Sequence, residues 1–130
     1  MSLSKTPNGI NNAARLYAGT ECVAEQVIWA QSWWEQLRGV IGRHLAPTNA
    51  LLIPGCSQVH TAFVAYPITV AFCRAEGEGG ATWRVLSVQT LPPWNVSRHV
   101  RGATLAIEMP LGSPLRGVSV GDLLTETLRI

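Results

Sequence analysis

Apolar and polar residues alternate along much of this chain, and a period of two residues is typical of β-strands. The longest apolar run is residues 56–72, CSQVHTAFVAYPITVAF, which follows the turn residues Pro54 and Gly55. We predict two buried strands in it, 57–65 and 68–74, joined by a turn at Tyr66 and Pro67.

Shorter stretches on both sides of this run also predict strands. They are residues 14–18, 22–29, 50–53, 82–89, 104–109 and 123–128. Gly19-Thr20 and the glycine-rich residues 76–80 are expected to be hairpin turns. Residues 91–101 have two prolines and no period, which predicts a long loop of the kind that often carries function.

One segment has the pattern of a helix. Ser32 followed by Glu35 forms a capping box, in which each side chain bonds to the backbone N–H of the other. Apolar residues then recur at helical spacing at Trp34, Leu37 and Ile41. Gly42 is a favourable C-terminal cap. We predict a short helix at about 32–42.

Together these elements predict a mainly β fold, α+β by strict count. It is built either as a small barrel or as two packed antiparallel sheets with the one short helix. Residues 1–19 are expected to be a partly loose tail and residues 20–130 a single compact domain. A chain of 130 residues, 47% of them hydrophobic and 14% charged, is suited to one core and does not have the composition of a disordered protein.

Charge and cysteine content narrow the class of protein. The net charge of +2 is too small to imply nucleic acid or an anionic membrane by itself. No run approaches about eighteen apolar residues and no export signal is recognisable, so we expect a cytoplasmic protein without a membrane span. The odd set of Cys22, Cys56 and Cys73 has no CxxC spacing, which favours free thiols over a disulfide framework or a zinc ribbon.

The central run carries a family resemblance. Residues 60–63, HTAF, followed by residues 67–72, PITVAF, resemble the central motif of an uncharacterised bacterial and archaeal family known as domain of unknown function 192. Residues 30–43, AQSWWEQLRGVIGR, are similar to its opening motif. Thr69 stands where many relatives have an aspartate, so a role of that aspartate does not carry over to this chain.

Two later segments extend the resemblance. Residues 106–109, AIEM, are similar to a hydrophobic-glutamate-hydrophobic element of the family, and residues 120–122, VGD, to its final glycine-aspartate turn. The resemblance covers roughly residues 20–128. It implies a compact, mainly β domain and no established biochemical activity.

His60 is the first candidate for chemistry, as a hydrogen-bonded residue of the fold or as an exposed donor or base. A metal site with Cys56 is not expected, because four residues of extended strand span about 13 Å, too far for two ligands at roughly 2.0–2.3 Å from one ion. No cofactor is expected either.

Glu108 is the second candidate, because it lies among apolar residues and a buried carboxylate is costly unless it is paired. The expected partners are Arg38 or Arg43 of the predicted helix, in a salt bridge. Alternatively, Arg43, His60 and Glu108 meet at one mouth of the barrel and bind a small polar or anionic ligand.

The loop supplies the remaining candidates, Trp94, Arg98 and Arg101, which together with His60 could form a binding rim. The sequence therefore favours an accessory domain that binds a ligand or a protein partner without catalysis. One alternative is an enzyme with His60 as general base and Glu108 or Asp122 as its partner. A second is single-stranded nucleic-acid binding, although nucleic acid is not the expected partner.

Overall fold

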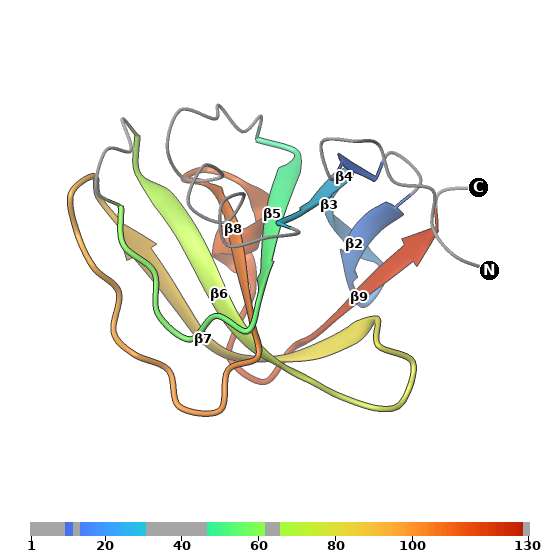
Figure 1. The fold of residues 1–130 in the computed structure, drawn as a ribbon. Coiled ribbons are helices and arrows are strands. Elements are labelled where there is room, and N and C mark those ends of the chain that lie inside the picture. The colour runs from blue at the N-terminus through green and yellow to red at the C-terminus, as the bar shows by residue number, and fades with distance from the viewer. Residues whose placement is uncertain (1–9, 12–13, 31–46, 62–65, 129–130) are drawn as a thin grey trace.

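The structure, a computed structural model, describes residues 10–11, 14–30, 47–61 and 66–128. Within these ranges nine strands form one continuous sheet in the order β1-β4-β5-β8-β6-β7-β9-β2-β3 (Figure 1). The elements are β1 (Ile10–Asn11), β2 (Ala14–Ala18), β3 (Glu21–Ala24), β4 (Gln26–Trp29), β5 (Asn49–Pro54), β6 (Ile68–Ala75), β7 (Thr82–Leu91), β8 (Leu105–Pro110), the short 3-10 helix η1 (Pro114–Gly117) and β9 (Leu123–Leu128).

The sheet curls until its ends approach each other. Strand β2 contacts β4, and the Trp29 indole N–H on β4 donates to a Glu126 carboxylate oxygen on β9 at 2.9 Å. The Trp29 ring also packs against Trp83 on β7, with centroids 5.8 Å apart and planes tilted by 53°. The predicted mainly β, barrel-like fold is confirmed, and it consists of one curved sheet rather than two packed sheets.

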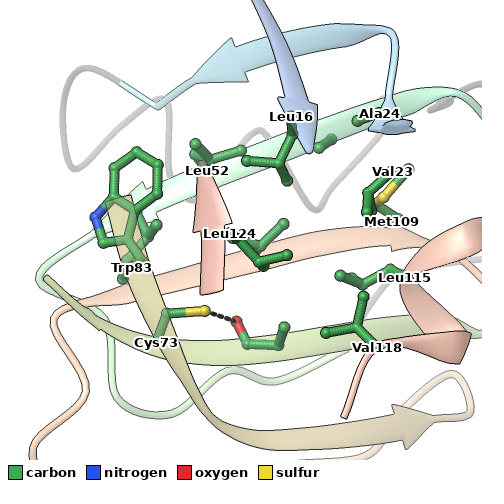
Figure 2. Close-up of a cluster of buried hydrophobic side chains, with 14 of the residues drawn as sticks. Leu16, Val23, Ala24, Leu52, Cys73, Trp83, Met109, Leu115, Val118 and Leu124 are labelled. Carbon is green, nitrogen blue, oxygen red and sulfur yellow. Dashed lines mark hydrogen bonds between the residues drawn. The ribbon is translucent and has the colours of Figure 1, made fainter. Parts of the chain in front are cut away.

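The sheet packs against apolar side chains on both of its faces. The interior of the barrel is filled from most strands and from η1, and Figure 2 shows Leu16, Leu52, Leu115 and Leu124 among the side chains that meet there. A second layer lies on the outer face of β4, β5, β6 and β8, where loop residues such as Val59 cover it. Strands buried on both faces need continuous apolar runs, which explains the sequence of the central strands. The covering loops are the ones that carry the predicted binding residues.

The predicted strand 22–29 is in fact two strands. The backbone N–H groups of Glu25 and Gln26 both donate to the Thr48 carbonyl, at 2.9 and 3.2 Å, and the chain bends there. Before the bend β3 pairs with β2, and after it β4 pairs with β5 in parallel. The β4–β5 pair is thus parallel, unlike the strands of the two antiparallel sheets expected as the alternative to a barrel. The predicted helix 32–42, in the connection between them, lies outside the described residues.

Of the two buried strands predicted at 57–65 and 68–74, the second is confirmed as β6, and the first is wrong where it can be compared. Strand β6 is present, but its two edges are occupied by β7 and β8. No edge of β6 is left for residues 57–61, which instead lie outside the sheet with one isolated bridge, between His60 and Val96. Residues 62–65 are outside the described part of the chain.

The N-terminal hairpin is confirmed. Strands β2 and β3 pair around Gly19, which has the positive φ of 63° that such a turn requires. Ala14 and Leu16 are buried in the barrel, so residues 14–18 belong to the sheet although they fall within the expected tail, 1–19. In the described residues no helix has the length and apolar character needed to cross a membrane.

Candidate functional site: the rim loops

Two loops lie side by side outside the sheet, and we call them the rim loops: residues 57–61, in green, and residues 92–101, in orange (Figure 1). They run antiparallel, as the bridge between His60 and Val96 shows. Backbone hydrogen bonds join them from the N–H of Thr61 to Asn95 O at 2.7 Å, of Trp94 to Thr61 O at 2.9 Å, of Ser97 to Val59 O at 2.8 Å and of Val100 to Ser57 O at 2.8 Å. The loops are thus a small two-strand ladder laid over the outer apolar layer.

The buried side chain of Thr61 joins the two rim loops at one end of the ladder. Its hydroxyl donates to the Pro92 carbonyl at 2.7 Å and accepts from the Asn95 N–H, also at 2.7 Å. These bonds fix the chain on both sides of Trp94. Thr61 is therefore a positioning residue of the rim loops.

Two further buried polar side chains anchor the rim loops. The Ser97 hydroxyl oxygen accepts from the Val59 N–H at 3.0 Å. The Gln89 side-chain oxygen on β7 accepts from the Arg98 N–H at 2.9 Å. Because buried N–H groups are costly to leave unpaired, these contacts hold the loops in one arrangement on the sheet.

Replacing Thr61 by valine is expected to lower the free energy of unfolding by about 1–3 kcal/mol, because the isosteric side chain leaves the Asn95 N–H and the Pro92 carbonyl without their partner. Chemical denaturation measures this. Thr90→Val on the exposed face of β7 is the matched control and should change stability by no more than about 0.5 kcal/mol. Equal stabilities for the two variants would contradict the anchoring role of Thr61.

The outward side chains include all four predicted rim residues. His60 is exposed opposite Val96, which is 62% exposed, and Trp94 is 65% exposed. Trp94 has a φ of 62°, the one non-glycine residue with positive φ in the described ranges. Arg98 and Arg101 are exposed farther along the same loop. The structure thus brings His60, Trp94, Arg98 and Arg101 onto one pair of hydrogen-bonded loops.

The electrostatics of the rim loops follow from their sequence. Residues 56–61 and 92–104 contain two arginines and two histidines and no aspartate or glutamate. The described residues form one ion pair, between Arg84 and Glu76, and this pair lies outside the rim loops. The rim loops therefore present uncompensated positive charge beside exposed apolar side chains.

Glu108 does not lie on this surface. It is in the middle of β8, aligned between Leu51 of β5 and Val70 of β6, and is 2% exposed on the outer apolar face. Its Oε1 has no hydrogen-bond partner in the described part of the chain. Burial raises the pKa of Glu108 to about 8, so the carboxyl is largely protonated at neutral pH. A shared ligand site with exposed His60 is not formed by these residues.

The partners expected for Glu108 cannot be placed beside it. Arg38 and Arg43 both lie outside the described residues, so the predicted salt bridge and the predicted ligand contact of Arg43 stay predictions. The neutral form of the carboxyl removes the need for a counter-charge, which was the reason for expecting one.

The enzyme alternative requires a carboxylate within hydrogen-bond reach of His60. Asp122 lies in the turn before β9, where its Oδ2 accepts from the Ser119 N–H at 2.9 Å. Within the described ranges no hydrogen bond or ion pair joins His60 to Asp122 or Glu108. The pair on which that alternative depends is not assembled there.

The cysteines are free thiols in the structure, as predicted. Burial raises the pKa of Cys73 to about 12 and also raises that of Cys56, so both resist ionisation at neutral pH. Among the described residues no cluster of three or more potential ligands could hold a metal ion.

Sequence reasoning missed several residues of this site. Val96 and His99 are exposed members of the rim loops, and nothing in a loop without periodicity distinguishes them. Gln89 and Ser97 anchor the loops from buried positions. Gln89 could have been noticed, because it is a polar residue in phase with Trp83 and Val85 at the end of the predicted alternating strand 82–89.

Comparison with known proteins shows the fold and no more. Neither a family model nor a curated protein matches the chain. A solved structure from Sinorhizobium meliloti 1021, described as a "putative transcription regulator", is similar with a TM-score of 0.69 and 17% identity over 95% of this chain and 98% of that one. A protein of unknown function from Novosphingobium aromaticivorans is similar with a TM-score of 0.70 and 14% identity over 95% and 92% of the two chains.

Proposed function

We propose that this protein is a non-catalytic binding domain whose rim loops recognise an acidic protein segment carrying an apolar or aromatic side chain. The observation that carries this proposal is Trp94, 65% exposed on a backbone that hydrogen bonds hold in place. Tryptophan and arginine are the residue types that dominate binding energies at protein interfaces. A rigid aromatic anchor also loses little conformational entropy when a partner binds.

Charge complementarity selects the partner. Arg98 and Arg101 follow the apolar pair of Trp94 and Val96 along the same loop, and the rim loops contain no acid to oppose them. The positive charge of the two arginines attracts an acidic segment, and the apolar side chain of that segment can then contact Trp94 and Val96. A basic partner would be repelled.

We also propose that the chain belongs to the family of domain of unknown function 192 and acts in the bacterial cytoplasm. The order and spacing of the motifs support the family assignment. Three of the motif segments fall on structured elements of the barrel: 68–72 on β6, 106–109 on β8 and 120–122 in the turn before β9.

The proposal is tested by fluorescence anisotropy with two labelled peptides. One is rich in aspartate and glutamate with a single central tryptophan, and the other has asparagine and glutamine in place of the acids. The acidic peptide should bind more tightly, and Trp94→Ala should weaken it by about tenfold or more, as for an interface hot spot. The double variant Arg98→Glu, Arg101→Glu should abolish binding.

Arg116→Glu is the matched control, since Arg116 is exposed on η1, outside the rim loops, and should leave the affinity unchanged. The proposal is wrong if the neutral peptide binds equally well, or if Trp94→Ala binds the acidic peptide as tightly as the unaltered protein.

Single-stranded nucleic acid is the second candidate. An exposed tryptophan beside arginines suits base stacking and phosphate contact, and the similar Sinorhizobium meliloti protein is described as a "putative transcription regulator". A labelled oligothymidylate in the same assay separates the two functions. Tighter binding of the oligonucleotide than of the acidic peptide, with a steep loss as salt is added, would replace the proposed partner.

A further inference from the structure

A cleft of about 630 Å³ opens between the β2–β3 hairpin, η1 and the turn that precedes β9. The side chains that shape it include Glu21, Val23, Arg84, Val118, Asp122 and Leu123. Its size falls within the range of roughly 300–1,000 Å³ that is usual for sites of small ligands. None of the rim-loop residues lines this cleft.

One wall of the cleft is apolar. Val23 and Val118 belong to the edge of the interior cluster, where Figure 2 shows them beside Met109 and Leu115. Leu123, at the start of β9, is 39% exposed and adds a further apolar surface. This wall can pack against a short hydrocarbon stem.

Arg84, the basic residue that lines the cleft, already has an acidic partner. The Arg84 guanidinium donates from Nε to Glu76 Oε2 at 2.8 Å, from Nη2 to Glu76 Oε1, and from Nη1 to the Gly121 carbonyl at 2.8 Å. The hydrogen bond from Arg84 lowers the pKa of Glu76 below its ordinary value, so that the pair stays doubly ionised at neutral pH. Every nitrogen of the guanidinium is engaged.

The negative charge is not matched. Glu21 on β3 and Asp122 are both exposed and line the cleft, and neither forms an ion pair with any described residue. Asp122 uses Oδ2 for the Ser119 N–H, and no described donor bonds to its other oxygen. Arg116 is exposed on η1 but does not line the cleft. Glu21 and Asp122 thus line a cleft in which the one lining arginine, Arg84, is already paired with Glu76.

The rest of the lining leaves room. A Cβ atom built on Gly19, Gly117 or Gly121 would meet no heavy atom within 4 Å, so these backbone positions open onto empty space. Gly117 has no positive φ and accepts a side chain without backbone strain. It is therefore the position from which the cleft can be filled by substitution.

From these observations we propose that the cleft binds an organic cation, an ammonium or guanidinium group on a short apolar stem. Glu21 and Asp122 accept hydrogen bonds from the cationic head, while Val23 and Leu123 contact the stem. The same chemistry is offered by a free small amine and by a lysine or arginine side chain of another protein. This site is independent of the rim loops and of the function proposed for them.

The test is titration of the ¹⁵N-labelled protein, followed by the backbone amide signals of Gly19, Gly117 and Gly121. The probes are n-butylguanidinium, its neutral isostere n-butylurea, and a capped Gly-Arg-Gly peptide. Butylguanidinium should shift these signals saturably at millimolar concentration, and butylurea should not. Tighter binding of butylguanidinium than of the peptide identifies a small-molecule site, and the reverse identifies a site for a basic protein segment.

Two test variants and one control variant complete the design. Gly117→Leu should remove the shifts by filling the cleft, and Asp122→Asn should weaken binding about fivefold or more, the size of one charge contact near a protein surface. Asparagine keeps an acceptor for the Ser119 N–H, so this variant remains informative if Gly117→Leu does not fold. Glu78→Gln, an exposed acid that does not line the cleft, should bind like the unaltered protein. The inference is overturned if neither cation shifts the three signals, if butylurea shifts them equally, or if Asp122→Asn binds with unchanged affinity.

Discussion

Replacing Phe72 by alanine is expected to lower the free energy of unfolding by about 3–5 kcal/mol, the usual cost of truncating a buried aromatic side chain. Phe72 is fully buried at the centre of β6, in the outer apolar layer beneath the rim loops. The variant loses the transfer free energy of the ring and leaves a cavity between the sheet and the loops. Urea denaturation followed by tryptophan fluorescence measures the change.

Phe72→Leu should cost less, because most of the volume is retained. Val120→Ala removes an apolar side chain that is 67% exposed, and should change stability by no more than about 0.5 kcal/mol. If Phe72→Ala unfolds with the same free energy as Val120→Ala, the outer apolar layer is not a structural core. Weaker peptide binding by folded Phe72→Ala would show that the layer also supports the rim loops.

The free energy of unfolding is expected to fall as the pH rises from 4.5 to about 8, because of Glu108. Burial raises the pKa of Glu108 from its ordinary value of 4.5 to about 8. Between these values the unfolded chain releases the proton while the folded chain retains it, so increasing pH favours the unfolded state. The contribution is present in full below the lower pKa, is lost progressively up to the upper one, and amounts to roughly 5 kcal/mol.

Glu108→Gln tests this sign, because the amide has nearly the same shape and does not titrate. Its stability should vary less over the same pH interval and should exceed that of the unaltered protein at the alkaline end. Glu76 acts in a different window, since the hydrogen bond from Arg84 lowers its pKa and its contribution is lost only as the pH falls below 4.5. Glu78→Gln, in the exposed β6–β7 turn, should leave the profile unchanged. A profile for Glu108→Gln with the original slope would contradict the assignment.

Prediction from sequence was accurate where local pattern and turn residues agree. Strands β5, β6, β7, β8 and β9 each lie within a few residues of their predicted bounds. Their alternation or continuous apolar character follows from the faces that they bury, and glycine or proline marks their ends. Those signals are local, so they survive without knowledge of the neighbouring strands.

Prediction failed where the structure depends on which strand edges are free to pair with another segment. Residues 57–61 begin a run, 56–72, that is apolar enough for strands, but a loop that covers an outer apolar layer can have the same composition. The parallel pairing of β4 with β5 has no local signature either, because the residues of a short apolar strand do not specify the direction of its partner. In both cases the deciding contacts are with segments distant in sequence.

The candidate site divides in the same way. The sequence singled out His60, Trp94, Arg98 and Arg101 by residue type, but their meeting depends on the ladder that joins 57–61 to 92–101. Glu108 was recognised as a costly buried acid, yet only its position between Leu51 and Val70 shows how completely it is removed from water.

The amino-acid sequence by itself determined a mainly β domain with one long functional loop, because strand period and turn chemistry are properties of neighbouring residues. The tertiary structure decided the curling of one sheet into a barrel and the second apolar layer outside it. It also decided the placement of the rim loops and of the cleft that Glu21 and Asp122 line. Each of these depends on hydrogen bonds and packing between segments far apart in the chain, and a local pattern does not specify which distant partner a strand edge or a loop will meet.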